Sequence, residues 1–123
     1  MIVLALHHVQ LAMPAGGEDK ARVFYQEILG IPEVMKPPQL AAHAGVWFER
    51  ESLRVHLGVE HKFTAAKKAH PAFTVNDLSA VVNLLTENNY DVSLDTRIPN
   101  LKRIFTLDPF GNRIEIIEEN RGE

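Results

Sequence analysis

The chain has 123 residues, a formal net charge of −3 and 46% hydrophobic residues, a composition typical of soluble globular proteins. Nucleic-acid binding is not indicated, because it calls for a basic stripe, and the absence of cysteine excludes disulfides, thiolate zinc sites and cysteine nucleophiles. The apolar start, Met1 to Leu6, is too short for a membrane span and lacks the basic beginning of a signal peptide, so we expect a cytoplasmic protein.

Hydrophobic periodicity predicts a strand, a helix and three more strands in the first half of the chain. Glu18 and Asp19 place acidic groups in the first turn of the helix, and Gly30 follows its end. The loop that begins at Pro37 ends near Gly45. The expected elements are a strand over residues 3–12, a helix over 18–29, a short strand over 31–34 and a hairpin of 46–49 with 53–59.

The second half repeats this order after a polar linker at residues 61–68. Asn76 or Asp77 caps the predicted helix, and Asp108 to Gly111 has the chemistry of a type I turn, with proline second and glycine fourth. The expected elements are a strand over residues 69–75, a helix over 78–88 and strands over 92–94, 103–107 and 113–118. The predicted order is therefore β-α-β-β-β twice.

Each half offers two side chains that can bind a metal, at matching places. His8 and His70 open the first strands of the two halves, and His56 and Glu115 lie in the last strands. The spacings nearly agree, since 56 − 8 = 48 and 115 − 70 = 45. This pattern indicates one pseudo-symmetric metal site built from two similar halves.

Three stretches of the chain carry a family resemblance. The first is residues 8–11 (HVQL) followed by Phe24-Tyr25 and Leu29-Gly30, the second is residues 70–78 (HPAFTVNDL), and the third is residues 108–115 (DPFGNRIE). Together they make residues 4–119 resemble the vicinal-oxygen-chelate superfamily, which includes glyoxalase I, fosfomycin- and bleomycin-resistance proteins and extradiol dioxygenases.

The resemblance implies an α+β fold in which two βαβββ modules form a cup-shaped, curved sheet. We expect one glyoxalase-like domain over residues 1–123, with module one at about 3–60, the linker at about 61–68 and module two at about 69–119. Carried over by position, the metal ligands are His8, His56, His70 and Glu115. Such ligands suit nickel, zinc, manganese or ferrous iron.

The function implied by the resemblance is a metal-dependent enzyme acting on a small oxygenated substrate by isomerase, lyase or addition chemistry. Glu115 or His56 would serve as the catalytic base. An extradiol-type dioxygenase and a metal-free, drug-binding protein of the bleomycin-resistance type are the alternatives. We expect a homodimer that binds neither nucleic acid nor membrane. The ligands of each metal would come from the two modules of one chain or from modules of two chains. The use of a thiol cosubstrate is left open.

Other polar residues have competing interpretations. Gln10, Arg54, Arg103 and Arg113 are candidates for the substrate pocket, where an arginine would pair with a carboxylate or phosphonate, and surface salt bridges are the alternative. Glu115 lies between two isoleucines, so its charge requires a metal or an arginine partner. Three histidines are not expected to be ligands: His7 on the opposite strand face, His43 in a loop and His61 in the linker.

Overall fold

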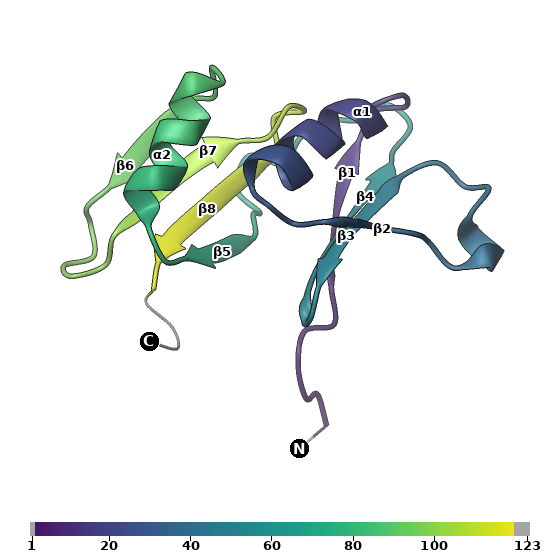
Figure 1. Ribbon diagram of the computed structural model, residues 1–123, viewed down its shortest axis with the longest axis horizontal. Helices are drawn as coiled ribbons and strands as arrows, with labels where there is room; N and C mark the ends of the chain where they lie inside the picture. The colour runs from purple at the N-terminus through teal and green to yellow at the C-terminus, as the bar shows by residue number, and fades with distance from the viewer. Residues whose placement is uncertain (1, 120–123) are drawn as a thin grey trace. The chain divides into compact units, whose positions relative to one another are not determined.

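The structure, a computed structural model, describes residues 2–119. The chain divides into two compact units, Met1–Thr64 and Ala65–Glu123. Each unit contains one four-stranded mixed sheet and a helix that follows its first strand, so the main elements run strand, helix, strand, strand, strand, and the first unit has an additional short 3-10 helix (Figure 1). The predicted α+β fold with a repeated βαβββ arrangement is confirmed.

The first unit has the sheet order β1-β4-β3-β2, in which β1 runs parallel to β4 and the other neighbours are antiparallel. Its elements are β1 (Val9–Met13), α1 (Glu18–Ala21), the π-helix η1 (Arg22–Ile28), β2 (Glu33–Val34), the short 3-10 helix η2 (Pro38–Leu40), β3 (Val46–Arg50) and β4 (Leu53–Val59).

The second unit repeats this arrangement with the order β5-β8-β7-β6, and β5 runs parallel to β8. Its elements are β5 (Ala72–Val75), α2 (Leu78–Glu87), β6 (Val92–Asp95), β7 (Arg103–Leu107) and β8 (Arg113–Glu118). The side chain of Asp77 accepts a hydrogen bond from the backbone N–H of Ala80 at 3.1 Å, which makes Asp77 the cap of α2.

The first strand is shorter than predicted. The sequence favours a strand over residues 3–12, but β1 begins at Val9 and residues 2–8 form no strand. The reason lies in its neighbour: Val9 pairs with Val55, and β4 begins only two residues earlier, at Leu53. In this register the residues before His7 lie beyond the start of β4, where the chain turns between β3 and β4, so they have no strand of this sheet to pair with. His8 precedes the strand instead of lying in it.

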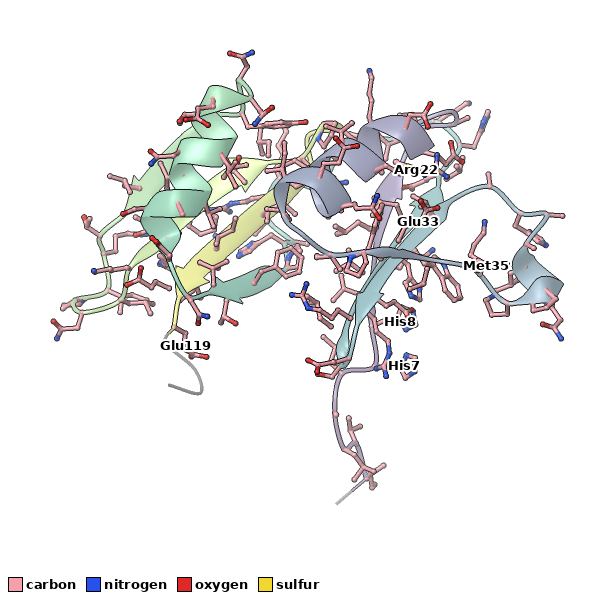
Figure 2. All side chains as sticks on the ribbon, viewed as in Figure 1. His7, His8, Arg22, Glu33, Met35 and Glu119 are labelled. Atoms are coloured by element: carbon pink, nitrogen blue, oxygen red, sulfur yellow. The ribbon has the colours of Figure 1, made fainter. Side chains whose placement is uncertain are left out.

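The first helix has the predicted position but a different hydrogen-bond pattern. A π-helix follows α1, and the N–H of Leu29 donates to the carbonyl oxygen of Phe24, five residues back, at 3.0 Å. Apolar spacing predicts which side of a helix is buried, but it does not predict which carbonyl each N–H will reach. Figure 2 shows Arg22 of this segment directed toward Glu33 of β2, with its Nε 2.9 Å from Glu33 Oε1.

Alternation along the strands separates a core face from a polar face in each unit. In the first unit, Phe24 and Tyr25 of the helix are buried with Phe48 of β3 and Val55 of β4. In the second unit, α2 covers one face of its sheet (Figure 1), and Leu85 is buried as are the strand residues Ile104, Ile114 and Ile116. The intervening strand residues lie on the other face, and these include His56 and Glu115.

The turn before β8 is built as its sequence predicts. The N–H of Gly111 donates to the carbonyl oxygen of Asp108 at 3.1 Å, and the Asp108 carboxylate accepts from the backbone N–H groups of Phe110 and Asn112. Gly111 has a φ of +91°, which glycine adopts at little cost. This turn fixes the register in which β8 pairs with β7, and so it positions Arg113 and Glu115.

Candidate metal and substrate site

The two units place their candidate ligands in the same register. In the first unit, Gln10 pairs with His56, and His8 lies two residues before Gln10. In the second unit, Ala72 pairs with Glu115, and His70 lies two residues before Ala72. An aromatic residue of the third strand is the cross-strand neighbour in each case: Trp47 for His56 and Phe105 for Glu115. The two pairs of candidate ligands are thus structurally equivalent.

In the second unit, Glu115 lies at the centre of a charged network. Its Oε1 is 2.9 Å from Nε2 of His70, and its Oε2 accepts a hydrogen bond from Nη1 of Arg103, also at 2.9 Å. Nη2 of Arg103 lies 3.1 Å from Oδ2 of Asp95, which in turn binds Arg97. The side chains of Arg103, Asp95 and Glu115 are 13%, 8% and 8% exposed, so these three groups are largely withdrawn from water, whereas Arg97 is exposed.

The network keeps Glu115 ionised. Burial raises the pKa of a carboxyl, but the hydrogen bonds from His70 and Arg103 outweigh it, and the pKa of Glu115 lies below its ordinary value. Hydrogen bonds from Arg97 likewise hold the pKa of Asp95 far below its ordinary value. The arginine partner that the buried charge of Glu115 requires is therefore Arg103. A carboxylate held in this form is the form that binds metals.

Both ring nitrogens of His70 face acceptors. Nδ1 lies 2.8 Å from the carbonyl oxygen of Lys68, and Nε2 lies 2.9 Å from Glu115 Oε1. A neutral imidazole carries one N–H, so it can donate to only one of these acceptors. If Nδ1 donates to Lys68, the Nε2 lone pair points at a carboxylate oxygen. Protonation of the ring or a bound cation resolves that conflict.

In the first unit, His56 is held within an aromatic stack. The ring centroids of His56 and Trp47 are 3.8 Å apart with an interplanar angle of 3°, and His8 stacks on His56 at 4.4 Å. Nε2 of His56 lies 2.7 Å from Oε2 of Glu49. Burial lowers the pKa of His56, and the hydrogen bond with Glu49 opposes this shift without reversing it. His56 is therefore a neutral base at pH 7.

His7 and His8 precede β1 side by side (Figure 2), and their Nδ1 atoms are 3.0 Å apart. We expected them on opposite faces of a regular strand, but no strand forms there, and the two rings meet edge to face with centroids 5.2 Å apart. His43 and His61 are exposed on loops. Neither has a ring contact or an ion pair with any described residue.

The four expected pocket residues make different contacts. Arg103 joins the Glu115 network, and Arg113 stacks on Phe105, with its guanidinium carbon 4.1 Å from the ring centroid. Arg54 donates to the backbone carbonyl oxygen of His7 at 3.0 Å. Gln10 is exposed and lies over Gly58, where an added Cβ would come within 2.6 Å of its amide nitrogen.

Sequence reasoning missed Glu49 and Asp95. Each of these acids contacts a residue of the candidate site: Glu49 binds His56, and Asp95 binds Arg103. The predicted hairpin contains a signal for Glu49, since a turn at residues 51–52 sets Glu49 opposite Arg54 and diagonal to His56. Asp95 has no such signal, because its pairing with Arg103 spans a seven-residue loop whose shape the sequence does not define.

The described residues contain no group of three or more histidine, aspartate or glutamate side chains that could hold a metal ion. Nε2 of His70 and Oε1 of Glu115 are 2.9 Å apart, a hydrogen-bond distance. Two donor atoms each about 2.1 Å from an ion lie roughly 3.0–3.4 Å apart, so this pair would have to separate slightly to hold an ion. The donor set of imidazole and carboxylate also suits zinc, nickel, manganese or ferrous iron.

Comparison with known proteins defines the class. The model of the Glyoxalase/Bleomycin resistance protein/Dioxygenase superfamily matches residues 5–116. The chain belongs to this superfamily, which confirms the resemblance inferred from its three motifs. No match was found among curated proteins. Over residues 2–119, no helix has both the length and the apolar character needed to cross a membrane.

Several solved structures have the same fold as this chain. A glyoxalase family protein of Bacillus anthracis is 39% identical with a TM-score of 0.91, and the alignment covers 98% of each chain. A fosfomycin resistance protein of Listeria monocytogenes, in a complex with Mn(II), is 13% identical with a TM-score of 0.80, covering 98% of this chain and 95% of that one. An antibiotic binding protein of Streptomyces is 18% identical with a TM-score of 0.72, covering 98% and 99%.

Proposed function

We propose that this protein is a metal-dependent enzyme that acts on a small oxygenated substrate by isomerase, lyase or addition chemistry. The observation that carries the proposal is the pairing of His70 with Glu115. Two acceptors face a ring that has one N–H when neutral, and the spacing of Nε2 and Oε1 is close to that of two ligands on one ion. A divalent cation held by these two residues would take the place of the missing proton.

The proposed ligands are His8, His70 and Glu115, with His56 as a fourth ligand or a close neighbour. Lys68 supports this set, because its carbonyl oxygen can accept from Nδ1 of His70, and in that tautomer the Nε2 lone pair, which faces Glu115, would bind the metal. Nickel, zinc, manganese or ferrous iron would suit the donors. When bound, such an ion supplies Lewis-acid stabilisation to two neighbouring oxygens of the substrate.

The chain's own residues would move the proton. Glu115 or His56 is the proposed catalytic base. His56 is suited to this role because Glu49 accepts from Nε2, which leaves the Nδ1 lone pair of a neutral ring to take up a proton. Glu49 would then stabilise the imidazolium that forms. The stacked rings of Trp47 and His8 hold His56 in place.

A homodimer is also proposed, because a symmetric pair is the commonest oligomer and the ligand set draws on both units. The metal would be held within one chain or shared between two. Light scattering that gives the mass of a monomer at micromolar concentration would refute the dimer.

One observation favours a different function, the binding of a drug without metal. Arg103 already neutralises the buried charge of Glu115, so this unit is electrostatically satisfied without a cation. The antibiotic binding protein of Streptomyces has the same fold. In this alternative the polar face of each sheet binds an organic molecule directly.

Metal analysis separates these functions. We expect the wild type, purified without chelator, to take up a divalent ion, and Glu115→Gln to weaken its affinity by ~100-fold or more, since even residues that only support ligands typically contribute 10–100-fold. Glu87→Gln, at an exposed position of α2, is the control and should keep the wild-type affinity. Equal affinity in wild type and Glu115→Gln would exclude Glu115 as a ligand.

Activity then identifies the chemistry. The panel consists of α-keto aldehyde–thiol adducts, epoxide antibiotics with thiols, and catechols. Metal-dependent turnover of either of the first two supports the proposal, and oxygen uptake with catechol favours the dioxygenase instead. Tight drug binding without turnover, unchanged by a chelator, would establish the binding protein.

A further inference from the structure

We propose that Arg113 binds an anionic group of the substrate, a carboxylate or a phosphoryl or phosphonyl group, and thereby selects for anionic substrates. This inference rests on the proposed function, because it concerns the substrate of the same site. It adds a second recognition point to the metal ligands and restricts the substrate class.

Arg113 lies on the polar face of its sheet, close to Glu115. The two residues are separated by one position on β8, so their side chains leave the same face roughly 7 Å apart. Phe105 of β7 pairs directly with Glu115, and the guanidinium carbon of Arg113 lies 4.1 Å from the centre of its ring. This stacking holds the guanidinium by its face and leaves its N–H groups, which lie in its plane, available to an acceptor.

A small pocket adjoins this guanidinium. It has a volume of about 250 Å³ and lies on the second unit only. Its lining is mostly apolar, and Ser93 and Arg113 lie among the lining residues with Phe105 and Leu107. An arginine at the edge of an apolar pocket suits the planar, two-oxygen edge of a carboxylate or phosphate.

The other arginines of the polar faces are already occupied. Arg103 binds both Glu115 and Asp95. Arg54 is the counterpart of Arg113 in the first unit, since each lies two residues before the candidate ligand of the last strand, and it donates to the carbonyl oxygen of His7. The guanidinium of Arg113 has no ion pair or hydrogen bond with any described residue, including Asp91, the one acid that lines the pocket.

The placement defines a substrate with two ends. One end carries two neighbouring oxygens for the metal held by His70 and Glu115, and the other carries an anionic group for Arg113. Because the two residues are roughly 7 Å apart, the linking carbon chain must be short. A hydroxy acid with a second acidic group three or four carbons away meets both requirements.

The test uses 2-hydroxyglutarate and 2-hydroxyvalerate, which differ only in the distal carboxylate. We expect the metal-loaded protein to bind 2-hydroxyglutarate on the order of 10- to 100-fold more tightly by calorimetry, the effect of a charged hydrogen-bonded pair. Arg113→Gln should abolish this preference without lowering metal affinity. Arg50→Gln, which removes an exposed arginine of the first unit, should keep it. 2-Hydroxy-4-phosphonobutyrate shows whether a phosphonate is preferred to a carboxylate.

The outcomes separate the two proposals. If the metal binds but neither acid is preferred, or neither binds, or the preference survives Arg113→Gln, the role of Arg113 is refuted and the metal site stands. If no metal binds, the proposed function fails, and glutarate, which has no hydroxyl, then probes Arg113 alone. Glutarate binding that Arg113→Gln removes would keep the anion site, and absent or unchanged binding would overturn it.

Discussion

The two units share a topology and a strand register, yet they stabilise the equivalent position of the last strand by opposite means. In the first unit that position is His56, a neutral base between two rings with one carboxylate beside it. In the second unit it is Glu115, an anion held by a histidine and an arginine. The register of a sheet therefore fixes where a polar side chain lies, and its neighbours determine which charge it carries.

The largest expected change in the free energy of unfolding comes from breaking the charged network of the second unit. Arg103→Met removes the guanidinium that pairs with the carboxylates of Glu115 and Asp95. Removing one partner of a buried ion pair typically costs about 3 kcal/mol. Urea unfolding followed by circular dichroism measures the loss. Lys102→Met is the control, because Lys102 is 75% exposed and its pair with Glu118 should contribute little. A loss below about 1 kcal/mol for Arg103→Met would contradict the structure.

A smaller effect is expected at the helix starts, which differ between the units. Asp77 caps α2 with its side chain, whereas Gly17 at the start of α1 has no side chain to do so. Asp77→Ala should lower the free energy of unfolding by about 1 kcal/mol, because the N–H of Ala80 loses its acceptor. Asp77→Asn keeps an acceptor and should be nearly neutral. Equal losses in the two variants would show that charge, and not capping, is responsible.

At neutral pH the smallest effect comes from His56, and it grows on acidification. Its pKa is lower in the folded chain than the ordinary 6.5, so the unfolded chain takes up a proton first as the pH falls through that value. The free energy of unfolding should therefore decrease from about pH 6.5 downward, until the folded-state pKa is reached. Glu115 acts in a separate window: its pKa lies below 4.5, so its contribution is lost only in stronger acid.

Urea unfolding of the chelator-treated protein at a series of pH values measures both windows. His56→Gln should flatten the decrease near neutrality and leave the strongly acid decrease in place. His43→Gln, an exposed loop position, is the control and should keep both. An unchanged slope between pH 5 and 7 in His56→Gln would show that His56 is not buried as a neutral base.

The sequence predicts the repeat and the places of His56 and Glu115 in the last strands because both depend on local patterns, whereas His8 and His70 precede the strands in which they were expected. Alternation identifies the faces of β4 and β8, and the chemistry of Asp108 to Gly111 predicts its turn. The buried charge of Glu115 predicts a metal or an arginine partner, and Arg103 is such an arginine. The π-helix, the start of β1 and the partners Glu49 and Asp95 depend on where separate segments meet. Those contacts are set by register and loop shape, which alternation within one strand does not determine.

The stack on His56 has a practical consequence. The chain has a single tryptophan, Trp47, and its ring lies face to face with that imidazole. Its emission therefore responds to what happens at His56, whether proton uptake, ligand binding or the separation of β3 from β4, while the second unit contributes only Tyr90. Tryptophan fluorescence recorded beside circular dichroism distinguishes an event in the first unit from one in the whole chain without any added label.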